Sequence, residues 1–250
     1  LKNRGIKNVE HYLNTDDSDI LSPTLIQNIE EGAKMLVSHI ARNSKVLVQV
    51  DSDCDGYTSA AALINYLNKL FPAFVQNNIS YRPHTGKMHG LILDTIPEGV
   101  NLVIAPDSSS EDYEVHKTLK EKGIDVLVID HHEAKRFSEY ACVINNQLCD
   151  YPTKSLSGVG MVYKFCSYLD SLLNVDYAKD ILDLVALGLV ADMVSLQDYE
   201  TRHLISLGLS NICNPYFKGM TIKNEYSLKG KVTPFGVAFY IAPYVNATIR

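Results

Sequence analysis

Short hydrophobic runs alternate along the chain with segments that have the hydrophobic spacing of helices. Four runs rich in Val, Ile and Leu predict buried strands, at residues 45–50, 101–105, 126–129 and 141–144. Helical patterns are found between them at 58–70 and 111–122. Strands that alternate with helices predict an α/β fold, in which a parallel β-sheet carries helices on both faces.

The segments before and after this alternation have different patterns. Residues 1–20 are polar and predict an irregular lead-in, and Ser22 with Pro23 predicts the start of an amphipathic helix that runs to about Arg42. From Ser157 onward the pattern is helical, which predicts a mainly helical C-terminal portion. The expected helices there are 158–172, 177–194 and 201–212.

These patterns divide the chain into three parts. We expect a lead-in and helix at 1–44, an α/β core at 45–197 and a helical extension at 198–250. Because the first residue is Leu1 rather than Met, we expect the chain to be a piece of a longer polypeptide.

Composition excludes several classes of protein. The 250 residues are 46% hydrophobic and 21% charged, which suffices for a large buried core. The net charge of −6 disfavours a surface that attracts nucleic acid everywhere, but it leaves room for a local basic groove. The five cysteines include no CxxC pair, which favours reduced thiols. Without a membrane-length apolar run or a signal pattern, we expect a cytoplasmic protein that has no membrane partner.

Acidic residues and histidines gather where three of the predicted strands end. The first strand runs into Asp51-x-Asp53-x-Asp55-Gly56, another stops at Asp107, and a third stops at Asp130-His131-His132. In an extended segment, alternate side chains point the same way, so Asp53 and Asp55 are expected to face one site. Because ligands of parallel sheets collect beyond the carboxyl ends of the strands, the three clusters are expected to converge.

Carboxylates mixed with imidazoles suit manganese and related divalent ions. Asp192 adds a carboxylate inside the apolar run 187–194, where burial is costly unless the group is paired or binds a metal. Other interpretations exist for each cluster: a polar turn for the histidines, and a helix cap or salt bridge for Asp107 and Asp192. A calcium-binding EF-hand is excluded because its twelfth position requires Glu and is Ala62 here.

Several motifs resemble those of the DHH phosphoesterase superfamily. They are Asp53-x-Asp55-Gly56, Asp107, Asp130-His131-His132 and Ala191-Asp192, within a similarity that runs from about residue 45 to residue 250. Segments 156–164 and 239–247 resemble the RecJ exonucleases within that superfamily. In such proteins a DHH-associated second domain follows, and we expect this chain to stop before it.

The resemblance implies a role for each residue of the site. Asp53 would bind one metal ion, Asp55 and His131 the other, Asp107 would bridge the two, and Asp192 would complete the site. The cofactors would be two divalent metal ions, with Mn²⁺ favoured and Mg²⁺ as the alternative. Two such ions can share a hydroxide nucleophile and stabilise charge on the phosphoryl oxygens. His132 would contact the scissile phosphate as a hydrogen-bond donor or general acid, which makes Asp107 and His132 the catalytic residues.

Contacts with the substrate are expected at three further places. Ser157, Gly158 and Gly160 begin a helix whose backbone N–H groups could hold a phosphate, although close helix packing explains the glycines nearly as well. His84 and Lys87, with Arg82 nearby, are candidates for a phosphate contact in a loop that resembles one of RecJ. Arg250 corresponds to an arginine near the end of the RecJ catalytic domain.

The chain also departs from the family pattern. Gln49 stands where family members commonly carry a histidine, so one metal ion is expected to be held more weakly. Thr85 replaces an arginine, His89 an aromatic residue, and Tyr244 another arginine. An ammonium group cannot reproduce the bidentate contact of a guanidinium. We therefore expect the metal centre to be retained and the affinity for the strand to differ.

The resemblance implies a 5′ to 3′ exonuclease that acts on single-stranded nucleic acid, with DNA favoured, and that has DNA-repair or replication proteins as possible partners. One alternative is a DHH phosphodiesterase for short RNAs, phosphoadenosine phosphate or cyclic dinucleotides. A second is an inactive RecJ-like scaffold. A dehydrogenase is disfavoured because no G-x-G-x-x-G motif follows the early strands.

Overall fold

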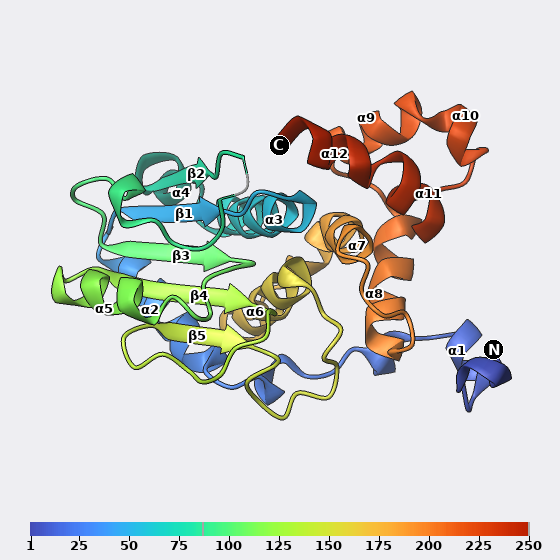
Figure 1. Ribbon diagram of the computed structural model, residues 1–250, viewed down its shortest axis with the longest axis horizontal. Coiled ribbons are helices and arrows are strands. Elements are labelled where there is room, and N and C mark those ends of the chain that lie inside the picture. Colours follow the sequence, from blue (N-terminus) through green and yellow to red (C-terminus); the bar gives the residue numbers. More distant parts are fainter. Residues whose placement is uncertain (87, 250) are drawn as a thin grey trace.

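The computed structural model describes residues 1–86 and 88–249, and its centre is a five-stranded parallel sheet (Figure 1). The strands are ordered β2-β1-β3-β4-β5 across the sheet. Their bounds are β1 Val46–Val50, β2 Ile79–Pro83, β3 Leu102–Pro106, β4 Asp125–Asp130 and β5 Cys142–Asn145. The register places Pro106 beside Ile129 and Asp130 beside Asn145, so the carboxyl ends of β3, β4 and β5 meet at one edge.

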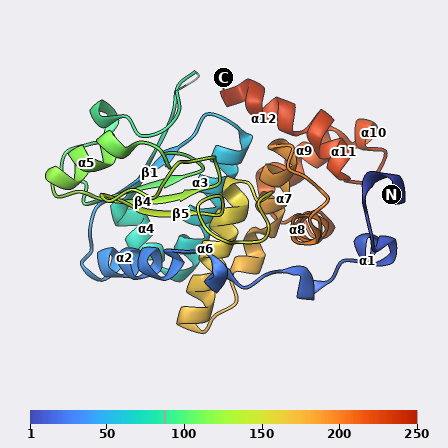
Figure 2. The same cartoon turned by 60° about the horizontal axis from the view of Figure 1, so that its bottom comes forward.

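Helices cover both faces of the sheet, as the α/β prediction requires. One face packs against α2 (Ile29–Ala41), α3 (Cys54–Leu70) and α6 (Gly158–Leu173), and α5 (Tyr113–Glu121) lies on the opposite face (Figure 2). Side chains alternate between the two layers: Val46 and Val48 of β1 join the first core, and Leu47 joins the second. The predicted fold class is therefore confirmed.

The C-terminal part of the chain is helical and lies beyond the carboxyl end of the sheet (Figure 1). Its elements are α7 Leu182–Ala191, α8 Tyr199–Ser210, α9 Pro215–Lys223, α10 Glu225–Leu228, α11 Pro234–Tyr240 and α12 Ala242–Ile249. Helix α7 packs against α3 and α8, and it joins this layer to the sheet. Among the described residues, no helix combines the length and the hydrophobicity that a membrane crossing requires.

The helix predicted from Ser22 to about Arg42 is interrupted. Ser22 caps only a 3₁₀ turn, Pro23–Leu25, and α2 begins at Ile29. Asn28 adopts a left-handed conformation with φ 66° and donates from Nδ2 to the carbonyl of Val143 in β5 at 2.9 Å. This contact with the sheet fixes a break that the hydrophobic spacing does not reveal.

Other boundaries also differ from the expected ones. Helix α3 begins at Cys54, four residues before the predicted start, because Asp53 caps it. The helix expected at 177–194 divides into a 3₁₀ turn, Ala178–Ile181, and α7. The lead-in contains α1 (Val9–Leu13) and 3₁₀ turns at Lys2–Arg4 and Asp17–Asp19. Helix α4 (Pro72–Asn78), strand β2 and the 3₁₀ turn Leu93–Thr95 were not predicted.

A buried ion pair fastens the helical layer to the N-terminal segment. Lys164 of α6 is fully buried, pairs with Glu200 of α8 and donates to the carbonyl of Leu21 at 2.7 Å. The hydroxyl of Tyr151 donates to the same Glu200 carboxylate at 2.9 Å. These partners satisfy charges that would otherwise be costly to bury.

Candidate metal centre

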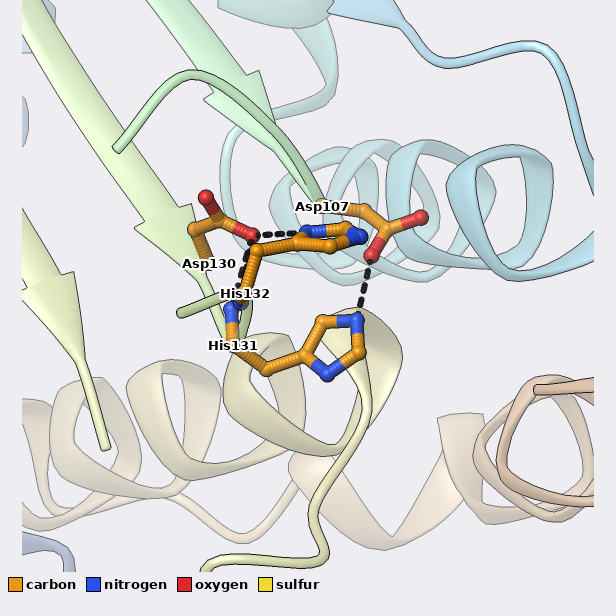
Figure 3. A group of neighbouring side chains, drawn as sticks. All are labelled: Asp107, Asp130, His131 and His132. Atoms are coloured by element: carbon orange, nitrogen blue, oxygen red, sulfur yellow. Dashed lines mark hydrogen bonds and ion pairs between the residues drawn. The ribbon is translucent and has the colours of Figure 1, made fainter. Parts of the chain in front are cut away.

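The ends of β3 and β4 bring Asp107 and the Asp130-His131-His132 motif together (Figure 3). His131 Nε2 lies 3.1 Å from Asp107 Oδ1. Asp107 and Ser109 have φ values of 68° and 82°, which non-glycine residues rarely adopt. Such backbone strain is concentrated at functional sites, where the surrounding structure must hold it.

Asp130 orients the two histidines that follow it. Its carboxylate accepts hydrogen bonds from the backbone N–H groups of His131 at 2.7 Å and His132 at 3.2 Å, and from His132 Nδ1 at 2.7 Å (Figure 3). The backbone N–H of Ser110 donates to the same carboxylate at 3.1 Å. Burial opposes ionisation, but the bonds from His132 and Ser110 outweigh it, and the pKa of Asp130 is lowered. The hydrogen bond to Asp130 raises the pKa of His132 to about 9, which favours the cationic form of His132 in the metal-free protein.

Asp55 lies in the first turn of α3 and is held by the beginning of α6. Ser157 Oγ and the Gly158 N–H donate to its two carboxylate oxygens at 2.9 and 2.6 Å, and the Val159 N–H donates at 3.2 Å. A helix N-terminus favours a negative charge in this way. Burial nevertheless raises the pKa of Asp55, and only part of that effect is offset by His131.

Asp53 caps α3, accepting from the Gly56 N–H at 3.0 Å. The expectation that Asp53 and Asp55 alternate along an extended segment is therefore wrong, because the helix begins between them. Their carboxylates join different groups. Ligand atoms of Asp55, His131 and Asp192 all lie within 4.8 Å of one another, and the same holds for those of Asp51, Asp53 and Asp107.

Asp192 reaches this centre from the end of α7, where it is the C-cap residue. Its Oδ2 and Asp55 Oδ2 each lie 3.9 Å from His131 Nε2. Burial and the carboxylates of Asp55 and Asp53 raise the pKa of Asp192 to about 7. Gly188 lets α7 approach, since a Cβ there would collide with Asp55 and Thr58.

The charge balance of the centre calls for a cation. Burial and the neighbouring charges of Asp55 and Asp53 raise the pKa of Asp107 well above its ordinary value. Asp51 Oδ1 is buried and has no hydrogen-bond partner among the described residues. Burial lowers the pKa of His131, which keeps its imidazole neutral and able to bind a metal. The residues present thus fit divalent cations, and the five predicted ligands, Asp53, Asp55, Asp107, His131 and Asp192, gather in one place.

The residues predicted to contact the substrate do not all face the metal centre with free polar groups. The N–H of Gly158 and the hydroxyl of Ser157 are engaged by Asp55, and Gly160 packs against Leu156 and Leu189. His84 is buried, with Nε2 2.7 Å from the Gly90 carbonyl and Nδ1 3.3 Å from Gln49 Nε2. These contacts favour structural roles, and the phosphate contacts stay predictions. Lys87 and Arg250 lie outside the described residues.

Further residues of the centre were not predicted. Asp51 shares the alternate spacing of Asp53 and Asp55, a signal that could have identified it. Its Oδ2 lies 2.9 Å from His89 Nδ1, and the His89 and His132 rings are 5.3 Å apart. Asn145 Nδ2 donates to the His132 carbonyl at 2.9 Å and so holds the histidine loop. No sequence pattern marks the contacts of His89 or of Asn145, because each joins separate segments of the chain.

Replacing Gly158 by alanine is expected to weaken the binding of Mn²⁺ about 10- to 100-fold. The new Cβ would overlap the carboxylate of Asp107, which has to move aside. Titration calorimetry with Mn²⁺ measures this effect. Gly160→Ala, whose Cβ would meet only Leu156 and Leu189, is the control and should bind Mn²⁺ nearly as the unmodified protein does. Equal affinities for both variants would contradict the close approach of α6 to Asp107.

Comparison with known proteins identifies the family. A model of the N-terminal domain of the DHH family matches residues 45–189. The chain belongs to the DHH family. This DHH chain is 44% identical over its whole length to YorK of Bacillus subtilis (strain 168), an SPbeta prophage-derived protein named as a single-strand DNA-specific exonuclease. It is 30% identical, again over its whole length, to the single-stranded-DNA-specific exonuclease RecJ of the same organism.

The DHH chain spans less than half of these curated relatives, 43% of YorK and 32% of Bacillus subtilis RecJ. Among solved structures, exonuclease RecJ bound to manganese matches 92% of this chain and 59% of its own with a TM-score of 0.78. The sequence identity is 24%, and the likeness shows that the fold is shared. The predicted resemblance to the DHH phosphoesterases and to RecJ is therefore confirmed.

Proposed function

We propose that the chain is the catalytic part of a metal-dependent phosphodiesterase that hydrolyses single-stranded nucleic acid, DNA by preference, from the 5′ end. One observation carries the proposal. Two groups of potential metal ligands, Asp55-His131-Asp192 and Asp51-Asp53-Asp107, adjoin at the carboxyl edge of the sheet, where His131 and Asp107 are 3.1 Å apart. The names of YorK and RecJ support the same substrate class.

The ligand set suits two divalent cations, with Mn²⁺ favoured because carboxylates and imidazole are mixed. The solved RecJ structure with manganese supports this choice. Asp53 would hold one ion, Asp55, His131 and Asp192 the other, and Asp107 would lie between them. When bound, such ions lower the pKa of an attacking water and neutralise charge that builds on the phosphoryl oxygens.

The protein's own residues position and protonate the substrate. His132 donates from Nδ1 to Asp130, so its Nε2 is the nitrogen left to meet a phosphate oxygen. Its raised pKa of about 9 keeps that nitrogen protonated at neutral pH, as a general acid or a cationic hydrogen-bond donor requires. Asp130 acts through His132 and has the role of a positioning residue.

Degradation of labelled oligonucleotides tests the proposal. Single-stranded DNA labelled at its 5′ end should release labelled mononucleotide first in the presence of Mn²⁺, and a chelator should stop the reaction. Duplex DNA of the same sequence should resist. Faster turnover of dinucleotides than of long strands would instead support the small-substrate phosphodiesterase. Bound Mn²⁺ without hydrolysis of any of these would support the inactive scaffold.

A further inference from the structure

Helix α11 exposes a cluster of aromatic side chains that contribute little to the core. Phe235 and Phe239 are 63% and 60% exposed, and their ring centroids are 4.5 Å apart. The ring of Tyr240 lies 6.4 Å from that of Phe235. We call these three residues the aromatic platform. An exposed aromatic cluster of this kind marks a surface that binds something.

The aromatic platform is linked to the metal centre through the residue that follows Asp192. Phe235 and Met193 line one hollow of about 200 Å³, and Met193 directly follows Asp192 in the chain. Met193 is 77% exposed and has a left-handed backbone with φ 57°, so an apolar side chain is held in solvent beside a predicted metal ligand. Helix α11 also packs against α7, the helix that ends at Asp192.

The segment that carries the aromatic platform is basic in an otherwise acidic protein. Residues 211–249 contain four lysines and one acidic residue, whereas the whole chain has a net charge of −6. The lysines are all exposed; they are Lys218, Lys223, Lys229 and Lys231. Lys231 lines a second hollow of about 600 Å³, which shares Leu196 and Pro234 with the first. An anionic partner that presents flat apolar groups would match both features.

We propose that the aromatic platform stacks the bases of the single-stranded nucleic acid whose scissile phosphate lies at the metal centre. The inference rests on the proposed function and adds to it the surface that holds the strand. Stacking on aromatic rings tolerates any base sequence, since every base has a flat face, and lysines attract the intervening phosphates. Because a duplex keeps its bases stacked inside, the aromatic platform selects single strands.

Binding of two fluorescent oligomers, measured by anisotropy in a chelator that prevents hydrolysis, separates stacking from charge. One is oligothymidine, and the other is an abasic oligomer with the same number of phosphates. Phe235→Ala and Phe239→Ala should each weaken oligothymidine binding about tenfold and leave the abasic oligomer unaffected. Phe239→Tyr should restore the affinity. Lys231→Ala should weaken the binding of both oligomers equally. It should also lower the slope of log affinity against log salt concentration by about one, the value of one phosphate contact.

Tyr140→Ala is the matched control. It removes an exposed aromatic ring just before β5, at the opposite end of the sheet, and should change neither affinity. If both phenylalanine variants bind oligothymidine as the unmodified protein does, and the unmodified protein cleaves DNA, the stacking role of the aromatic platform is overturned and the proposed function is not. A wild-type protein that neither binds nor cleaves any single strand would overturn the proposed function as well. Phenylalanine variants that change only the molecular mass in light scattering would assign the surface to a second copy of the chain.

Discussion

Replacing Asp107 by alanine is expected to lower manganese-dependent hydrolysis of single-stranded DNA by at least about a thousandfold. Asp107 is buried, lies 3.1 Å from His131 and shares a group of potential ligands with Asp51 and Asp53. Its carboxylate thus belongs to one group and lies beside His131 of the other. Its loss should therefore remove the ligand that the two proposed metal positions share. Initial rates of DNA degradation at saturating Mn²⁺ measure the effect.

The fold should survive this substitution. Burial and nearby carboxylates raise the pKa of Asp107, so in the absence of metal its charge opposes folding rather than supporting it. Asp107→Asn, which keeps the shape and removes the charge, should melt at or above the temperature of the unmodified metal-free protein. Mn²⁺ should raise the melting temperature of the unmodified protein more than that of the variant. Undiminished hydrolysis by Asp107→Ala would exclude Asp107 as a shared ligand.

The sequence predicted the core of the sheet and the convergence of the site for one physical reason. Strands β1, β3, β4 and β5 are buried on both faces, so each forms an apolar run that stops abruptly at polar residues. The parallel arrangement then places Asp107 and Asp130-His131-His132 at one edge. Both inferences need only the local pattern and the rule that ligands of parallel sheets collect beyond the carboxyl ends of the strands.

Strand β2 could not be predicted in the same way. It lies at the edge of the sheet, most of its residues are exposed, and Arg82 and Pro83 interrupt any hydrophobic run. Its pairing with β1 depends on tertiary contact, which overrides local preference. The break at Asn28 has the same origin, because the hydrogen bond to Val143 joins residues far apart in the sequence.

The supporting contacts of the site were hidden for a related reason. Asn246 Oδ1 accepts from the Cys54 N–H at 2.9 Å and ties α12 to the start of α3, between Asp53 and Asp55. Asn145 holds the histidine loop from the neighbouring strand. A lone asparagine has many uses in a protein, so its position in space is needed before its role can be inferred. Motifs identified the candidate metal ligands because several acidic residues and histidines occur close together.

The affinity for Mn²⁺ is expected to fall at least about a hundredfold between pH 7 and pH 5. Asp192, whose pKa is raised to about 7 by burial and by Asp55 and Asp53, must lose its proton before it can bind a metal. One proton costs about tenfold in affinity for each pH unit below 7. Asp107 and Asp55, whose pKa values are also raised by burial, make the dependence steeper.

The sign of the effect on stability follows from the same shift. The folded pKa of Asp192 lies above its ordinary value of 3.8, so its contribution to the metal-free fold is present at acidic pH and is lost as the pH rises through about 7. Mn²⁺ should therefore stabilise the protein more at pH 8 than at pH 5.5, as thermal melts can measure. His132→Gln should keep the slope of affinity against pH, because the pKa of His132, about 9, lies above this range. Asp192→Asn should reduce the slope of Mn²⁺ affinity against pH by one proton. Equal affinities at pH 5 and pH 7 in the unmodified protein would show that the carboxylates of the centre take up no protons between these two pH values.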